Sequence, residues 1–388
     1  MITETILQQY PNRWIKAEDG LIVTADVWQC TQEYHRQRAN FHALFKQGPG
    51  IIAGLEVVAK DPPNSALYIL PGIAINALGQ IIVVPEIQSF DLGLNLDGLL
   101  YLLLSYGQSR SKPSQKDHKP GDASYIQAEF SLAARDQYSP PAIELARVRR
   151  SQKDSVIVNA ANYSRPTADE IDLNFRRQVG PPVDVSIGLC YLGQVQEKDH
   201  GMALGQVVQS LNSSGYCWAH VEDEIPLDSL LTQHNLIYLV GQGDLDIGED
   251  MRDTLRRYLL EESGTILFEA IDDIAKSRFK AILDSMTIQL KELSADHPLL
   301  TRPYLFAAPP PTNRSEAIST VWAGSGIVMI DSGYSRLWQG RHPEGLPSRE
   351  EIRAAIEWGS NLIAYAIERR RVSGRRVIGQ RVVNDTNG

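Results

Sequence analysis

Residues 236–244 have the sequence Leu-Ile-Tyr-Leu-Val-Gly-Gln-Gly-Asp, in which five apolar or aromatic residues end at a glycine-rich turn. A short apolar run bounded by turn residues is typical of a buried strand, so we predict a strand over 236–240. The chain continues with an amphipathic helix over 247–262 and another apolar strand over 265–268. A strand, a helix and a second strand in this order indicate a βαβ unit with two parallel strands.

The same alternation continues on both sides of this unit. We predict further strands over 185–192, 217–221 and 327–330, and helices over 203–211, 273–284 and 349–371. Strands that are separated by crossover helices imply a mainly parallel sheet with both faces covered. Residues 183–376 are therefore predicted to form an α/β domain, and residues 377–388 form a basic and polar tail.

The first part of the chain is predicted to be mostly β, with one long helix. Thr24 is a suitable N-cap and Gly48 and Pro49 cannot continue a helix, so we predict the helix over 25–46. Its expected core face contains Val27, Tyr34, Phe41, Leu44 and Phe45. Short β-branched or apolar runs follow at residues 51–59, 67–70, 73–76, 81–84, 99–105, 125–132 and 143–148. Residues 1–162 are thus predicted to form a β-rich domain.

A linker is predicted between these two parts. Residues 163–182 contain Pro166, Gly180, Pro181 and Pro182 and have mixed charges without a regular hydrophobic period. Such a composition is typical of a domain boundary. The fold class predicted from the sequence is a two-domain α+β chain, with a mostly β domain first and an α/β domain second.

Composition excludes several classes of protein. The 388 residues are 43% hydrophobic and 22% charged, which is ordinary for a globular chain. A net charge of −9 argues against nucleic acid as a partner. Three cysteines without a paired motif support neither a disulfide scaffold nor a zinc ribbon, and they favour a reducing compartment. The most apolar stretch, over 99–106, is too short to insert directly into a membrane.

The first domain contains motifs that resemble a known bacterial module. They are Asp-Gly-Leu-Ile-Val-Thr-Ala at 19–25, Tyr-His-Arg at 34–36, His42, Gly-Pro-Gly-Ile-Ile-Ala-Gly-Leu-Glu-Val at 48–57 and Pro-Gly-Ile-Ala-Ile-Asn at 71–76. The module is β-rich and is associated with phage-tail-like contractile injection systems. The resemblance implies a structural, baseplate-associated subunit whose partners are other subunits of such a particle, in multiple copies. It also implies a place in the bacterial cytoplasm, either free or attached to a membrane through the assembly.

The second domain is similar to an uncharacterised bacterial domain family with the fold of class I glutamine amidotransferases, which is flavodoxin-like. The match is carried by residues 236–243, 255–269, His-Pro-Leu-Leu at 297–300 and the last helix. Active members of that class place a cysteine on a sharp turn after a central strand. Neither 241–243 nor 269–271 contains Cys or Ser. Without a nucleophile this chemistry is unsupported, so we predict no enzymatic activity, no catalytic residue and no cofactor.

The alternative is an amidohydrolase-like enzyme or a small-ligand binder that uses the carboxyl edge of the sheet. The candidate ligand-binding residues are Asp244, Glu269, Ser332 and His342, because α/β folds bind ligands at that edge. Ser332 follows a predicted strand but lacks glycines on either side in the G-x-S-x-G pattern, which makes a turn the preferred interpretation.

A partner-binding surface is an equally open interpretation of the basic and aromatic residues near the end of the chain. Arg336, Trp338 and Arg341 supply the planar side chains that dominate interface energies. Arg375 and Arg376 belong to a basic segment that could order against an acidic neighbour. The polar loop at 107–121 carries a local charge of +3 and is predicted to be a surface connection or a docking loop.

Two further clusters are interpreted without a metal ion. Trp28, His35 and His42 are spaced by seven residues, which places the two histidines about 10 Å apart along a helix, too far to share one ion. Interior or interface packing is the preferred interpretation of that face. The acidic residues Asp244, Asp246, Glu249 and Asp250 begin like a calcium loop, but its twelfth position is Leu255. The spacing of Asp246 and Glu249 instead predicts a helix capping box.

Overall fold

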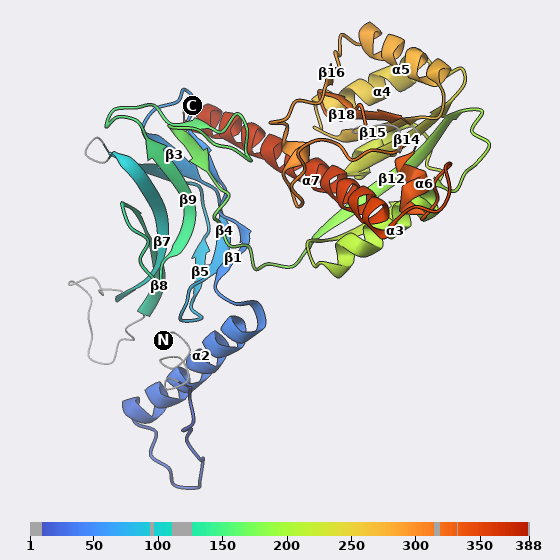
Figure 1. The fold of residues 1–388 in the computed structure, drawn as a ribbon. Coiled ribbons are helices and arrows are strands. Elements are labelled where there is room, and N and C mark those ends of the chain that lie inside the picture. Colours follow the sequence, from blue (N-terminus) through green and yellow to red (C-terminus); the bar gives the residue numbers. More distant parts are fainter. Residues whose placement is uncertain (1–9, 94–96, 111–125, 314–318, 332, 387–388) are drawn as a thin grey trace. The chain divides into compact units, whose positions relative to one another are not determined.

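A computed structural model describes residues 10–93, 97–110, 126–313, 319–331 and 333–386 of the chain. It divides into two compact units, residues 1–181 together with 379–388, and residues 182–378. The predicted two-domain α+β fold class is confirmed: the first unit is β-rich, and the second contains a mostly parallel sheet with helices (Figure 1).

The α/β unit is built on a seven-stranded sheet with the order β13-β12-β14-β15-β18-β17-β16. Its strands are β12 (Val183–Gly193), β13 (Cys217–Glu222), β14 (Leu236–Gln242), β15 (Thr265–Ala270), β16 (Lys291–Glu292), β17 (Trp322–Gly324) and β18 (Ile327–Asp331). The five strands from β13 to β18 are parallel, whereas β17 and β16 add an antiparallel edge. The carboxyl ends of the parallel strands therefore meet at one edge, as the sequence predicts.

Helices cover both faces of this sheet. They are α3 (His200–Ser213), α4 (Glu249–Leu260), α5 (Asp273–Ser285), the short α6 (Tyr334–Trp338) and α7 (Arg349–Thr386). Successive residues of β15 point to opposite faces: Leu267 belongs to the core cluster that includes residues of α3, α6 and α7. Phe268 belongs to the cluster of α4 and α5, where its ring stacks on Phe279 with 3.8 Å between centroids. This alternation is what a strand buried on both sides requires.

The β-rich unit contains three small sheets that share one hydrophobic core. Its strands are β1 (Gly50–Gly54), β2 (Val57–Ala59), β3 (Ala66–Ile69), β4 (Gly72–Ile75), β5 (Ile81–Val84), β6 (Gln88–Asp91), β7 (Gly98–Arg110), β8 (Ile126–Arg135), β9 (Ile143–Arg150), β10 (Val158–Asn159) and β11 (Glu170–Asp172). The predicted strand over 51–59 is two strands, because Leu55 adopts a positive φ of 56° between them. β7 and β8 pair in an antiparallel ladder that extends from Tyr101 with Arg135 to Arg110 with Ile126.

The structure differs from the sequence prediction in the linker and at the end of the last helix. β11 lies inside the predicted linker and pairs with β9, where Ile171 is opposite Val148 and only 3% exposed. A single buried isoleucine between charged residues gives too weak an alternation to be recognised as a strand. The last helix was predicted to end at 371, but α7 continues to Thr386.

Helix α2 (Ala25–Gln47) forms where the sequence predicts it. The Thr24 side chain accepts a hydrogen bond from the Val27 amide at 3.3 Å, and Gly48 ends the helix with a φ of 79°. Gly79 in the β4–β5 turn lies against this helix, since a Cβ there would be 2.1 Å from the Asn40 carbonyl oxygen. The turn therefore tolerates only glycine.

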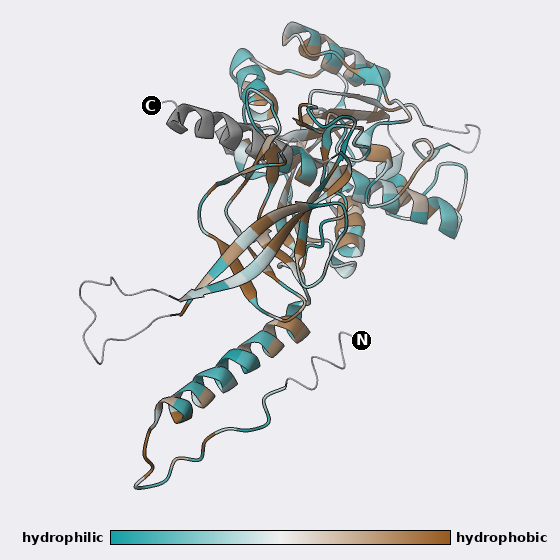
Figure 2. Cartoon of the chain, turned by 90° about the vertical axis from the view of Figure 1, so that its left-hand side faces the viewer, coloured by the Kyte–Doolittle hydropathy of each residue, from teal (hydrophilic) through white to brown (hydrophobic). Residues whose placement is uncertain are grey.

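The predicted core face of α2 is wrong in part. Only Phe41 is buried, and Phe45 is 63% exposed. The cover comes from a short segment before the helix: Tyr10 packs edge-on against Phe41 at 4.9 Å, and Trp14 lies 6.0 Å from Tyr34. Figure 2 shows that α2 is largely hydrophilic, with hydrophobic residues near both ends. Most of the helix surface is thus left without a packing partner among the described residues.

Candidate functional site

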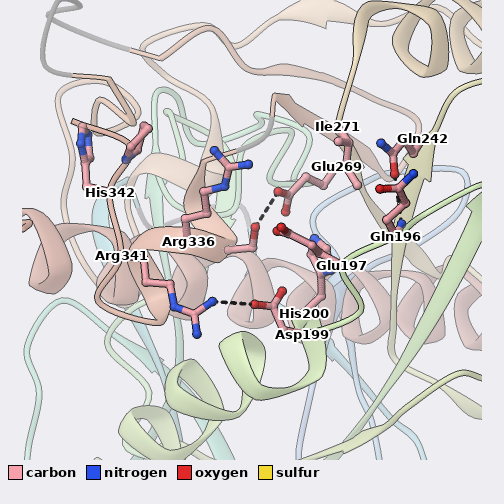
Figure 3. Close-up of a pocket in the computed structure, with 12 residues that line it drawn as sticks. Gln196, Glu197, Asp199, His200, Gln242, Glu269, Ile271, Arg336, Arg341 and His342 are labelled. Carbon is pink, nitrogen blue, oxygen red and sulfur yellow. Dashed lines mark hydrogen bonds and ion pairs between the residues drawn. The ribbon is translucent and has the colours of Figure 1, made fainter. Parts of the chain in front are cut away.

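A polar cavity of about 420 Å³ opens at the carboxyl edge of the parallel sheet in the α/β unit (Figure 3). Its walls come from the segment after β12, the ends of β14 and β15, the start of α3, and α6 with the loop that follows it. These segments are distant in sequence and meet because parallel strands end at one edge. The volume lies within the range of small-molecule sites.

Glu269 at the end of β15 is the buried centre of this site. It is only 1% exposed, and its carboxylate accepts hydrogen bonds from the hydroxyls of Tyr238 and Ser335, the latter at 2.7 Å. Burial, followed by the neighbouring Glu269 charge, raises the pKa of Tyr238 well above its usual value of 10, so the phenol keeps the proton that it donates. The two hydroxyls fix the carboxylate and leave part of its hydrogen-bonding capacity for other donors.

His200, the first residue of α3, is buried beside this network. It is 5% exposed, and its ring lies edge-on to Tyr191 at 5.8 Å and to Tyr238 at 6.0 Å. Its Nδ1 has no hydrogen-bond partner among the described residues. A buried polar atom without a partner is rare in folded proteins and is common at functional sites.

Charged and polar side chains line the mouth of the cavity. Arg341 forms an ion pair with Asp199 at 3.0 Å, whereas the exposed Arg336 has no ion pair among the described residues. Glu197 is also exposed there. The side-chain oxygen of Gln242 accepts a hydrogen bond from the backbone amide of Gln196 at 3.2 Å, which directs its NH₂ group elsewhere.

The tautomer of His342 follows from a backbone contact. Its Nδ1 accepts a hydrogen bond from the amide of Glu344 at 3.1 Å. In the neutral ring the proton must then reside on Nε2, which makes that atom a donor. His342 lines the cavity, so the cavity wall carries one more donor in addition to Arg336 and Gln242.

The predicted ligand-binding residues are only partly brought together. Glu269 and His342 both line the cavity. Asp244 does not, because its carboxylate forms an exposed ion pair with Arg278 of α5 at 2.8 Å. Ser332 lies outside the described residues. Ser335, one residue into α6, is the serine that lies in the cavity wall.

The predicted interface residues also separate. Arg336 and Arg341 are exposed and lie on the cavity. Trp338 needs a correction: it is 2% exposed and its indole N–H donates to the Ala355 carbonyl at 2.8 Å, so it is a core residue that no partner can reach. It faces inward because α6 packs on α3 and α7. The side chains of Arg375 and Arg376 lie outside the described residues.

The structure also places the two clusters that the sequence analysis interprets without a metal ion, on α2 and at the start of α4. His35 and His42 are exposed on α2, as is Trp28 at 61%. The capping box at Asp246 and Glu249 is wrong, because α4 begins at Glu249 after Gly248, without a side-chain cap. Its acidic first turn instead complements the helix dipole. Among the described residues, no group of three His, Cys, Asp or Glu side chains is placed to hold a metal ion.

Three residues of the site were missed from the sequence: Tyr238, His200 and Ser335. One signal was present, since Tyr238 and Glu269 are polar residues that lie between apolar neighbours in two strands. In the parallel ladder Val240 is opposite Glu269, so Tyr238 is two positions from the carboxylate on the neighbouring strand. Neither His200 nor Ser335 had a comparable signal, because each is placed by the start of a helix.

Comparisons with known proteins cover parts of the chain. Residues 218–367 match a family model described as a domain of unknown function, DUF4159. No curated protein matches the chain. None of the described helices has the length and apolar character needed to span a bilayer.

Several solved structures are similar to parts of the chain. A crystal structure of TssK matches with 10% identity and a TM-score of 0.28, over 38% of this chain and 40% of that one. A TssK-TssF-TssG baseplate subcomplex of the type VI secretion system matches with 12% identity and a TM-score of 0.29, over 52% and 69%. A ThuA-like protein from Bacteroides uniformis matches with 12% identity and a TM-score of 0.28, over 48% and 95%. Scores of this size describe local similarity and define neither partners nor activity.

Proposed function

We propose that the chain is a non-enzymatic structural component of a phage-tail-like contractile injection system, associated with its baseplate and acting through protein contacts. The observation that carries the proposal is the exposed face of α2. This helix has 23 residues and buries one, Phe41. Trp28 and Phe45 are 61% and 63% exposed on the same helix.

A long helix is stabilised mainly by burying one face against another element. On α2 the residues Trp28, His35 and His42 are separated by seven positions, and Phe45 follows three positions later. Seven-residue spacing keeps side chains on one face along several turns and is the spacing of helix–helix contacts. The exposed α2 face, defined by these four residues, therefore has the pattern of a surface that packs against another subunit.

The kind of assembly is proposed from the motifs of the β-rich unit. Two of their glycines fix the pairing of β1 with β4: a Cβ on Gly54 would lie 2.1 Å from the Pro71 carbonyl oxygen, and one on Gly72 would lie 2.4 Å from that of Ala53. The motif residues thus specify the local backbone of the module, which supports interpreting the resemblance as a shared module.

The non-enzymatic part of the proposal is supported by the carboxyl edge of the α/β sheet. Gly241 and Gln242 end β14 and Gly243 follows it, while Ile271 follows β15, so neither strand end offers a nucleophile. Ser335 in the cavity is 4% exposed and donates to Glu269. The Ser335 hydroxyl therefore donates its proton to a structural hydrogen bond with a carboxylate. A serine nucleophile would instead be activated by a neighbouring histidine base.

Purified particles from cells that carry a tagged copy of the chain test the proposal. Mass spectrometry and cryo-electron microscopy are expected to find the chain at constant stoichiometry. A Trp28→Ala, His42→Ala and Phe45→Ala triple variant is expected to be lost from the particles while remaining folded. The matched control is Trp218→Ala, which removes a tryptophan that is 54% exposed in the α/β unit. Particles without the wild-type chain, or with the triple variant at full occupancy, would contradict the proposal.

A further inference from the structure

The cavity at the carboxyl edge has features that a protein-contact function does not use. It is lined by residues of several elements and loops, among them the buried carboxylate Glu269. Its size of about 420 Å³ is that of a small-molecule site rather than of a packing defect. A docking role for α2 needs no such cavity in the other unit.

The wall carries three carboxylates, of Glu197, Asp199 and Glu269, and two guanidiniums, of Arg336 and Arg341, so an anion there is bound by contacts with one arginine and not by the overall charge. Asp199 is already paired with Arg341, and the oxygens of Glu269 each accept one hydroxyl donor. Arg336 is the lining cation without an ion pair among the described residues. A guanidinium presents a planar set of donors that matches the oxygens of a carboxylate or phosphate.

Two neutral donors extend this surface. His342 presents Nε2–H because its Nδ1 is occupied by the Glu344 amide, and Gln242 retains its NH₂ group because its oxygen is occupied by Gln196. Both side chains line the same cavity as Arg336 (Figure 3). Figure 3 shows His342 and Gln242 on different sides of Arg336, so a small oxyanion at Arg336 is placed with His342 and not with both donors.

Two carboxylates also line the cavity as acceptors. Glu269 has hydrogen-bonding capacity beyond its two bonds, and Glu197 is exposed at the mouth. Both acceptors suit ligand hydroxyls, which can donate to a carboxylate without carrying a charge.

We infer that this cavity binds a small hydroxylated oxyanion, with its carboxylate or phosphate group at Arg336 and His342 and its hydroxyls towards Glu269. The ligand is held by direct polar contacts. The inference is independent of the exposed α2 face, because it uses only residues of the α/β unit.

Isothermal titration calorimetry of the full chain at neutral pH and low salt tests this inference. The probes are glycerol 3-phosphate, glycerate and, as the uncharged comparison, glycerol. Binding of glycerol 3-phosphate alone assigns the site to phosphates, and binding of glycerate assigns it to carboxylates. No binding of either anion, or equal binding of glycerol, overturns the inference.

Variants at Arg336 distinguish binding at this site from nonspecific electrostatic attraction of anions to the protein. Arg336→Gln is expected to weaken anion binding about tenfold or more, the size of a lost charge-assisted hydrogen bond. Arg336→Lys keeps the charge and is expected to retain part of the affinity. The matched control is Arg353→Gln on α7, because Arg353 is an exposed arginine paired with Glu357 outside the cavity. An equal loss of binding in Arg353→Gln, or no loss in Arg336→Gln, would overturn the assignment.

Discussion

Helices of the two units differ sharply in how they are buried. α3 has 14 residues and buries six of them, whereas α2 has 23 residues and buries one. Both have hydrophobic residues at helical spacing and both form where the sequence predicts a helix. The difference shows that helical periodicity predicts where a helix forms. It does not predict what packs against that helix, which is decided by the rest of the fold or by another molecule.

The sheets of the two units show the same contrast. Strands β14 and β15 in the α/β unit are buried on both faces, with helices on each side. β8 in the β-rich unit is mostly exposed or half-buried along its length. The α/β unit therefore resembles a self-sufficient domain, and the β-rich unit keeps surfaces that can serve contacts.

The largest expected effect is a loss of stability on substitution of a buried tryptophan, compared with an exposed one in the other unit. Trp358 of α7 is fully buried and its ring lies 5.7 Å from Phe306 and 6.0 Å from Tyr334. Trp358→Ala is expected to lower the free energy of unfolding by about 3–5 kcal/mol, because it removes a large side chain and leaves a cavity. Urea denaturation of the full chain, followed by circular dichroism, measures the change in the transition of the α/β unit.

Trp28→Ala is the matched substitution in α2. The ring there is 61% exposed, so the expected change in unfolding free energy is within about 0.5 kcal/mol. A loss of stability in Trp28→Ala as large as that in Trp358→Ala would show that the α2 face is already packed within a single chain. The contrast between the two units would then fail.

An intermediate effect is expected at alkaline pH. In the α/β unit, burial raises the pKa of the Cys217 thiol to about 11 and that of Tyr238 well above 10. A group whose folded-state pKa lies above its unfolded value contributes in full below the unfolded pKa and loses that contribution as pH rises towards the folded pKa. The unfolding free energy of the α/β unit is therefore expected to fall from about pH 9 upwards, by about 1.4 kcal/mol per pH unit for a group such as Tyr238.

Tryptophan fluorescence during urea denaturation at increasing pH measures this loss, since four of the six tryptophans lie in the α/β unit. Tyr238→Phe removes one titrating group and is expected to reduce the slope above pH 10. In the β-rich unit, burial raises the pKa of Tyr138, but this side chain is 47% exposed, so the transition of that unit should change less. A steeper loss in the β-rich unit than in the α/β unit would contradict the interpretation.

The sequence predicted those features whose causes are local. The ends of α2 are fixed by Thr24 and Gly48, both of which act within one turn of the helix. The α/β sheet follows from the order of strands and helices, and the edge location of Glu269 and His342 follows from that order. These inferences needed no knowledge of side-chain contacts.

The remaining features depend on contacts between distant segments. Trp338 is predicted at an interface because Trp and Arg side chains supply large planar contacts, yet α6 turns its ring into the core. Ser335 meets Glu269 across 66 residues of sequence. Phe45 fits a helical core face, but no described element packs over it. Periodicity contains none of this information.

The smallest expected effect is that of a substitution just after β14. The ends of β14 and β15 show the contrast between exposed and buried residues within one unit. Glu269 at the end of β15 is buried among hydroxyl donors, whereas the Asp244 side chain after β14 is 75% exposed and pairs with Arg278. Asp244→Asn is expected to change stability by less than about 1 kcal/mol, because exposed ion pairs contribute little. It should also leave oxyanion affinity within about twofold of wild type, since the carboxylate is outside the cavity. A marked loss of binding in Asp244→Asn, measured by the same calorimetric titration, would move the site towards β14 and away from Glu269.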